Sequence, residues 1–162
     1  MDIMTLTLVH TALSFFALTL GFVAIRAIFA LTPAVWTDLF IVAAILVVAT
    51  GFLFPFKAFT PAFGTGIVAS VTLITMLLAR FVFGLSGWWR PIYDLGIVVN
   101  VFFLILVTIA QSFQKLPELH ALAPNGSEPP FLVAQLINLA VFAWIGFRVL
   151  GNSRGARKFS TL

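Results

Sequence analysis

The sequence predicts an all-α membrane protein, a single bundle of about five transmembrane helices. Hydrophobic residues make up 62% of the 162-residue chain, and charged residues only 9%, whereas soluble domains carry about 25% charged residues. One soluble core of this size could not hide so much apolar surface from water. The apolar runs are continuous and approach the roughly 20 residues that cross a bilayer as a helix. They lack the alternation with a period of two that is typical of a membrane β-barrel.

Five apolar stretches carry this prediction, and turn-forming or charged residues separate them. The predicted spans are residues 5–25, 39–56, 65–83, 95–113 and 131–150. The first is followed by Arg26, and its leader lacks the positive charge of a cleavable signal, so we expect it to remain as a span. Asp38 precedes the second span and Asp94 the fourth, where a carboxylate suits the positive end of a helix dipole. We therefore interpret both aspartates as helix caps.

Small residues in the first half of the third span predict close helix packing there. They are Gly66, Ala69, Ser70, Thr72 and Thr75. The longest connector, 114–130, contains four prolines, and we expect helical turns around 116–122 and extended chain over 124–130. The basic segment 152–162 is predicted to be a frayed cytoplasmic tail.

The segment between the third and fourth spans predicts a hairpin at the membrane surface. Glycines break the apolar pattern, amphipathic rings of the kind found at the headgroup boundary follow, and two arginines bracket the turn. The residues assigned to this lipid headgroup interface are Arg80, Trp88, Trp89, Arg90 and Tyr93.

The distribution of positive charge predicts an orientation. If the hairpin is cytoplasmic, seven of the nine Lys and Arg residues lie on that side, and only Lys57 and Lys115 lie opposite. This satisfies the positive-inside bias and predicts an outside N-terminus and a cytoplasmic C-terminus, in a bacterial inner membrane. The formal net charge of +4 then indicates contact with anionic lipid headgroups, not with nucleic acid. The chain contains no cysteine, which excludes disulfides and thiolate metal sites.

Polar side chains within the spans form a candidate cluster in the outer half of the bundle. They are His10, Ser14, Asn100, Gln111, Gln135 and Asn138. Such groups are costly in a bilayer unless they are paired. Two interpretations stay open: hydrogen-bonding contacts that hold helices together, or a ligand or proton pathway.

Two histidines raise the question of a cofactor, although no motif predicts one. A four-helix membrane bundle can hold b-type haem between two axial histidines, as transmembrane cytochromes b do. His10 and His120 would have to form one such site, with the connector folded back over the bundle mouth. The chain also has 19 phenylalanines, which favour lipid contact and packing, with a flat apolar ligand such as quinone as the alternative. No other metal site is predicted.

These observations favour a protein that is not an enzyme. No catalytic set or phosphate-binding loop is present, and we expect no carboxylate inside the bundle, which argues against proton-coupled transport. The predicted function is a non-enzymatic accessory or assembly subunit that acts through helix and lipid contacts, with other membrane subunits or itself as partner. The alternatives are a small-ligand carrier or channel formed by an oligomer, and a redox protein that binds haem or quinone near His10 and His120.

Overall fold

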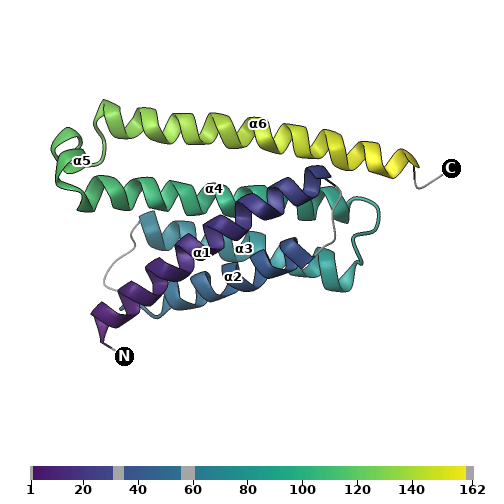
Figure 1. Ribbon diagram of the computed structural model, residues 1–162, viewed down its shortest axis with the longest axis horizontal. Coiled ribbons are helices and arrows are strands. Elements are labelled where there is room, and N and C mark those ends of the chain that lie inside the picture. Colours follow the sequence, from purple (N-terminus) through teal and green to yellow (C-terminus); the bar gives the residue numbers. More distant parts are fainter. Residues whose placement is uncertain (1, 31–34, 56–60, 160–162) are drawn as a thin grey trace.

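The protein is a bundle of long helices lying side by side (Figure 1). The computed structural model describes residues 2–30, 35–55 and 61–159, without the side chains of 61–62 and 153–159. The helices are α1 (Ile3–Ala30), α2 (Val35–Phe52), α3 (Pro61–Leu77), the π-helical turn η1 (Leu78–Val82), α4 (Trp89–Lys115), α5 (Pro117–Leu122) and α6 (Pro129–Phe159). Five of the described helices are long and apolar enough to cross a bilayer. The predicted all-α class with five spans is confirmed.

The helix ends differ from the predicted boundaries. Helix α4 begins at Trp89, so three of the residues assigned to the surface hairpin, Trp89, Arg90 and Tyr93, lie in its first two turns. Helix α6 continues to Phe159, through most of the segment expected to fray. The predicted helical turn in the connector is α5, but Pro129 and Pro130 belong to α6 and not to extended chain. Proline is tolerated in the first turn of a helix, where its missing N–H would have no partner anyway.

Glu128 organises the entry into α6. Its carboxylate accepts hydrogen bonds from the backbone N–H groups of Asn125 and Ser127, at 3.1 and 3.0 Å, and from the Asn125 side chain at 2.9 Å. Desolvation raises the pKa of Glu128, but these hydrogen bonds together outweigh it and leave the pKa below its usual value. The connector is therefore an ordered turn that fixes where α6 starts.

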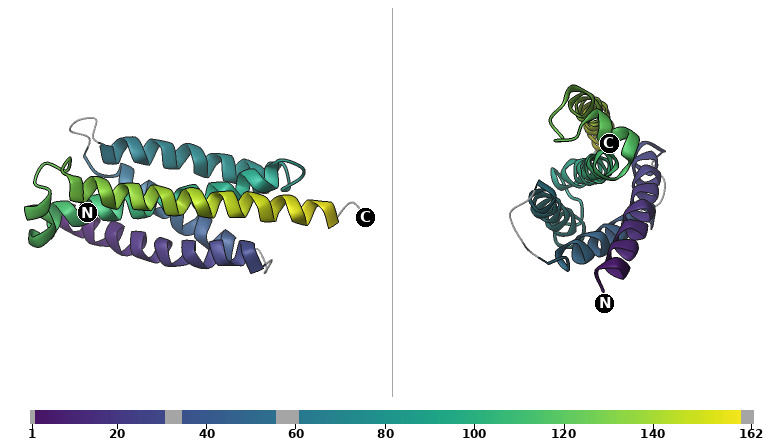
Figure 2. Two further views of the ribbon diagram at one scale, coloured as in Figure 1. Left: turned by 90° about the horizontal axis from the view of Figure 1, so that it is seen from above. Right: turned by 90° about the vertical axis from the view of Figure 1, so that its left-hand side faces the viewer.

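Helices α1 to α4 form a four-helix body, and α6 lies outside it against α4 (Figure 2). The core of the body is apolar, with Phe40, Met76, Ile97 and Val101 fully buried. Helix α6 meets α1 near its C-terminal part, where the Asn152 Nδ2 donates a hydrogen bond to the carbonyl oxygen of Ile28 at 3.1 Å. Toward the other end of the bundle α1 diverges from α6 (Figure 1).

Two glycines allow the helices of the body to cross closely. A Cβ atom at Gly21 would lie 2.5 Å from Val101 Cγ2, and one at Gly96 would lie 2.4 Å from Met76 Cγ. Gly66, which the sequence favoured for close packing, is different, since a Cβ there would only touch Phe52 at 3.9 Å. The glycines that permit these close contacts are therefore Gly21 of α1 and Gly96 of α4, and Gly66 of α3 is not one of them.

The turn between η1 and α4 requires left-handed backbone. Gly84, Leu85 and Gly87 have φ angles of 55°, 56° and 53°, and the Leu85 N–H donates a hydrogen bond to the carbonyl oxygen of Ala79 at 2.9 Å. The left-handed region raises the conformational energy of residues that have a Cβ atom, whereas glycine adopts it without this penalty.

Replacing Gly84 by alanine should therefore destabilise the protein by about 1 kcal/mol. No atom lies within 4 Å of a Cβ at this position, so the cost is that of the backbone conformation alone. Gly151→Ala is the matched control, because Gly151 is helical and equally open, and it should be neutral or stabilising by up to about 1 kcal/mol. Thermal unfolding in detergent, followed by circular dichroism, measures both. Equal effects of the two substitutions would contradict the assigned turn.

Candidate functional site

Charged side chains of the spans converge at the end of the bundle opposite α5, here called the charged end and defined by Asp38, Arg80, Arg90 and Asp94. In the first ion pair, the Arg80 Nε and Nη2 donate to the two carboxylate oxygens of Asp38, at 3.1 and 2.9 Å. A bidentate pair of this kind fixes geometry as well as charge. It joins the first turn of α2 to η1, which lie 42 residues apart in the chain.

The π-helical turn explains how Arg80 reaches Asp38. In η1 the Phe83 N–H bonds to the carbonyl oxygen of Leu78, five residues back. The extra residue in this turn changes the direction of the side chains that follow. Ala79 and Met76 remain in the core, while the neighbouring Arg80 is partly exposed and points to α2.

The second ion pair includes a carboxylate that is buried within the apolar helix α4. Asp94 is only 1% exposed, and both of its oxygens accept from the Nε of Arg90, at 3.2 and 3.0 Å. It lies in the second turn of α4, so the interpretation of Asp94 as a helix cap is wrong, as is the expectation that no carboxylate is buried. Asp38 does lie in the first turn of its helix, and it serves as the partner of Arg80 as well.

The aromatic rings assigned to the headgroup interface are placed differently from one another. Trp88 is exposed, and Trp89 stacks on Phe83 with ring centroids 3.9 Å apart. Tyr93, in contrast, is buried in the core, beside Thr37 of α2. An interface role does not fit Tyr93, because α4 begins before it and turns its ring inward.

His10 belongs to the contact between α1 and α2. Its Nδ1 lies 2.8 Å from Thr50 Oγ1, and Thr50 donates its single hydroxyl proton to the carbonyl oxygen of Leu46, also at 2.8 Å. The consistent assignment makes the His10 Nδ1–H the donor and leaves the lone pair on Nε2. The ring edge packs on Phe54 at 5.5 Å between centroids.

The two histidines lie on different helices, His10 on α1 and His120 on α5. His120 is exposed on α5, which lies at the end of α4, apart from α1 (Figure 1). Among the described residues no group of three or more His, Asp or Glu side chains could hold a metal ion. A haem ligated by His10 and His120 stays a prediction.

The remaining polar residues divide between two other contacts. Asn100 is buried between α4 and α3, where its Nδ2 donates to Thr72 Oγ1 at 2.9 Å and to the carbonyl oxygen of Gly96 at 3.0 Å. Gln135 Nε2 donates to the carbonyl oxygen of Leu106 at 3.1 Å, across the contact between α6 and α4. Asn138 is buried in the same contact.

The predicted polar cluster is thus divided among three helix contacts. His10 of α1 contacts Thr50 of α2, and the Ser14 hydroxyl donates within α1 to the carbonyl oxygen of His10. Asn100 lies between α3 and α4. Gln135 and Asn138 lie on α6, and Gln111 is half-buried on α4. Asn100 and His10 hold helices together by hydrogen bonds, as the first of the two open interpretations states.

No protein-family model, curated protein or solved structure matches this chain. The charged end, the polar helix contacts and the position of α6 are therefore the features that bear on function. The two ion pairs were not anticipated from the sequence. Arg90 and Asp94 are four residues apart, a spacing that places both on one helix face and could have revealed that pair. The pair between Arg80 and Asp38 has no such local signal.

Proposed function

We propose that the protein is a non-enzymatic accessory subunit of a bacterial inner-membrane assembly, and that it docks on its partner through α6. The position of α6 carries this proposal. It packs on α4 outside the four-helix body and leaves most of its apolar surface exposed. The exposed large side chains on α6 are Leu132, Val133, Leu136, Ile137, Leu139, Val141, Trp144 and Phe147. Lipid alone could cover this surface, so a second observation is needed to support a protein partner.

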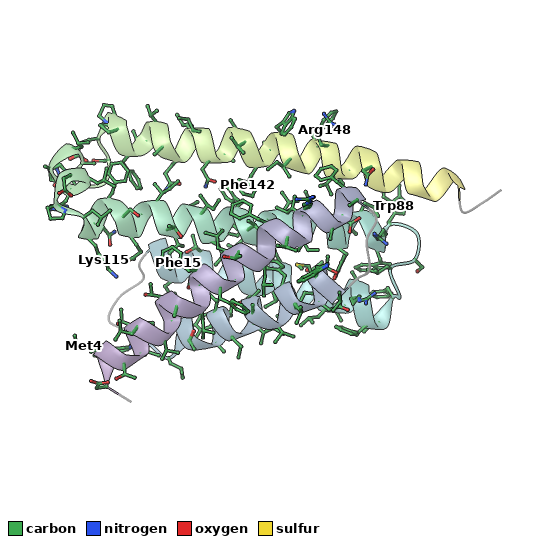
Figure 3. The ribbon with its side chains drawn as sticks, viewed as in Figure 1. Met4, Phe15, Trp88, Lys115, Phe142 and Arg148 are labelled. Atoms are coloured by element: carbon green, nitrogen blue, oxygen red, sulfur yellow. The ribbon has the colours of Figure 1, made fainter. Side chains whose placement is uncertain are left out.

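Arg148 supplies that observation. It is exposed on the apolar span of α6, its guanidinium lies 5.5 Å from the centre of the Trp144 ring, and it points away from α4 (Figure 3). No ion pair to Arg148 occurs among the residues whose side chains the structure describes. A cation inside a membrane span is stabilised by a carboxylate or by reaching the headgroups. We infer a partner helix that carries an acidic residue near this depth.

The orientation follows from the same charges. With the charged end in the cytoplasm, Arg26, Arg80, Arg90 and Arg148 are all on or near the cytoplasmic side, as the positive-inside bias favours. Reporter fusions after Arg90 and after Asn125 should then report opposite sides. Two fusions on the same side would contradict the five-span topology.

Cross-linking from α6 tests the docking proposal. A photoreactive residue at Ile137 or Phe147 should capture one specific membrane partner. The similarly exposed positions Val71 of α3 and Phe81 of η1 should label lipid only. Arg148→Gln should remove most of the cross-linked product, and Arg148→Lys, which keeps the charge, should retain it.

Two results would contradict the proposal. Equal capture from α3 and α6 would show that α6 is not a specific surface. Unchanged capture by the Arg148→Gln variant would show that the arginine serves only the lipid headgroups.

A further inference from the structure

The contact between α4 and α6 contains a buried amide without a partner. Asn138 is 5% exposed, and neither its Nδ2 nor its Oδ1 has a hydrogen-bond partner among the described residues. The Oε1 of Gln135, one turn away on the same face of α6, is also buried and unpartnered there. One donor group and two acceptor atoms therefore lie together, unused, in the contact that we call the α4–α6 seam.

Such groups are expensive in a bilayer. A buried amide without hydrogen bonds costs about 1–3 kcal/mol by mutational measures, and the hydrocarbon core offers no water to replace the missing partner. By contrast, Asn100, the other buried asparagine among the described residues, has its amide donor fully engaged. The unused groups of the seam thus indicate a partner that is not part of this chain.

Aromatic rings line the seam. Phe142 lies between α6 and α4 (Figure 3), and its centroid is 6.1 Å from that of Phe102, with the planes tilted by 58°. Phe102 in turn lies 5.3 Å from Phe103. Aromatic side chains next to a few well-placed polar groups are typical of sites for flat organic molecules.

The part of α4 beside the seam is partly exposed. Every residue of α4 from Phe102 to Ser112 is partly exposed, although the stretch before it, up to Val101, contributes much of the core. Asn138 is nine residues beyond Pro129, about 14 Å along the helix at 1.5 Å per residue. Because the polar atoms of Asn138 are buried, a ligand entering from the hydrocarbon layer must separate α4 and α6 here, at a depth below the headgroups.

We propose that the α4–α6 seam binds a lipid-soluble quinone or its quinol. A quinone carbonyl would accept a hydrogen bond from Asn138 Nδ2, and a quinol hydroxyl would donate to Asn138 Oδ1 or Gln135 Oε1. The ring would lie against Phe102 and Phe142. The ester carbonyls of glycerolipids share the acceptor chemistry, but they lack a flat ring and lie nearer the headgroups. This is a binding site without an electron-transfer step, and it is independent of docking through α6.

The test is a titration of the purified protein in nanodiscs with a short-chain ubiquinone and, separately, with its quinol. Binding should quench tryptophan fluorescence, since Trp144 is six residues from Asn138 on the same helix, and should raise the thermal midpoint. Asn138→Leu should weaken binding about tenfold or more, as expected for loss of the main hydrogen bonds. The same substitution should leave the thermal midpoint unchanged or higher, because it removes an unpartnered amide.

Asn100→Leu is the matched control, because it removes a buried asparagine that has partners. It should lower the thermal midpoint and leave the quinone affinity of the folded protein unchanged. A monoacylglycerol serves as the ligand control and should not compete with quinone.

Four outcomes would overturn the proposal. They are absence of saturable quenching in the wild-type protein, unchanged affinity in Asn138→Leu, a lowered midpoint in that variant, and equal competition by monoacylglycerol. The cross-linking result from α6 does not bear on any of them, so the two proposals can fail separately.

Discussion

Substitution of Gly21 by alanine should destabilise the protein by about 1–3 kcal/mol, the usual cost of an extra methyl group in a packed core. The new Cβ would lie 2.5 Å from Val101 Cγ2 and 3.1 Å from the ring of Phe40. Both of those side chains are fully buried, so α1 must move away from α4 and α2. Reversible unfolding in mixed micelles with increasing SDS, followed by circular dichroism, measures the free energy.

Gly66→Ala separates this steric effect from the general effect of replacing a helical glycine. A Cβ at Gly66 would make one ordinary contact, 3.9 Å from Phe52, so the substitution should be neutral or stabilise by up to about 1 kcal/mol. A Gly21→Ala variant as stable as Gly66→Ala would show that α1 and α4 do not cross at Gly21.

Substitution of Arg90 by methionine should have the second large effect, a loss of about 2–3 kcal/mol. Arg90 forms an ion pair with the buried Asp94, and removing one member of a buried pair leaves the charge of the other less compensated. The expected loss of unfolding free energy is smaller than for a fully buried pair, because the Arg90 side chain is 43% exposed and water screens part of the interaction. The double variant Arg90→Met with Asp94→Leu should recover most of the loss, since the buried carboxylate is then removed as well. The same unfolding measurement applies.

Arg80→Met provides the comparison for this pair. Both Arg80 and its partner Asp38 are partly exposed, so water can solvate Asp38 when the arginine is lost, and the cost should not exceed about 1 kcal/mol. If Arg80→Met lowered the free energy of unfolding as much as Arg90→Met, burial of Asp94 would not explain the large effect of Arg90→Met. If the double variant stayed as unstable as the single one, Arg90 would stabilise the fold by packing and not by charge.

The sequence was sufficient for the number of long helices. Each span can be recognised in the sequence independently of the others, because a helix satisfies its own backbone hydrogen bonds and lipid covers its apolar surface. The helix boundaries were less well predicted. Trp89, Arg90 and Tyr93 suit a membrane surface, but nothing in their chemistry prevents them from being helical, and α4 includes all three.

The candidate polar cluster shows why partners are harder to predict than spans. His10 pairs with Thr50, 40 residues away, and Asn100 pairs with Thr72, while Gln135 and Asn138 lie in a different contact. The prediction relied on similar depth along the spans, and depth does not determine which helices are neighbours. That information depends on the rotation of each helix about its axis.

The sequence by itself therefore determined that this protein is a five-span helical membrane protein. Composition and the length of each apolar run are enough to show whether a segment lies in lipid or in water. Only the tertiary structure decided which faces meet, that Gly21 and not Gly66 marks a close crossing, and that Asp94 is buried with Arg90. The physical reason is that lipid and protein interior are equally apolar. A membrane helix thus carries little of the amphipathic pattern that would show, in a soluble protein, which of its faces points inward.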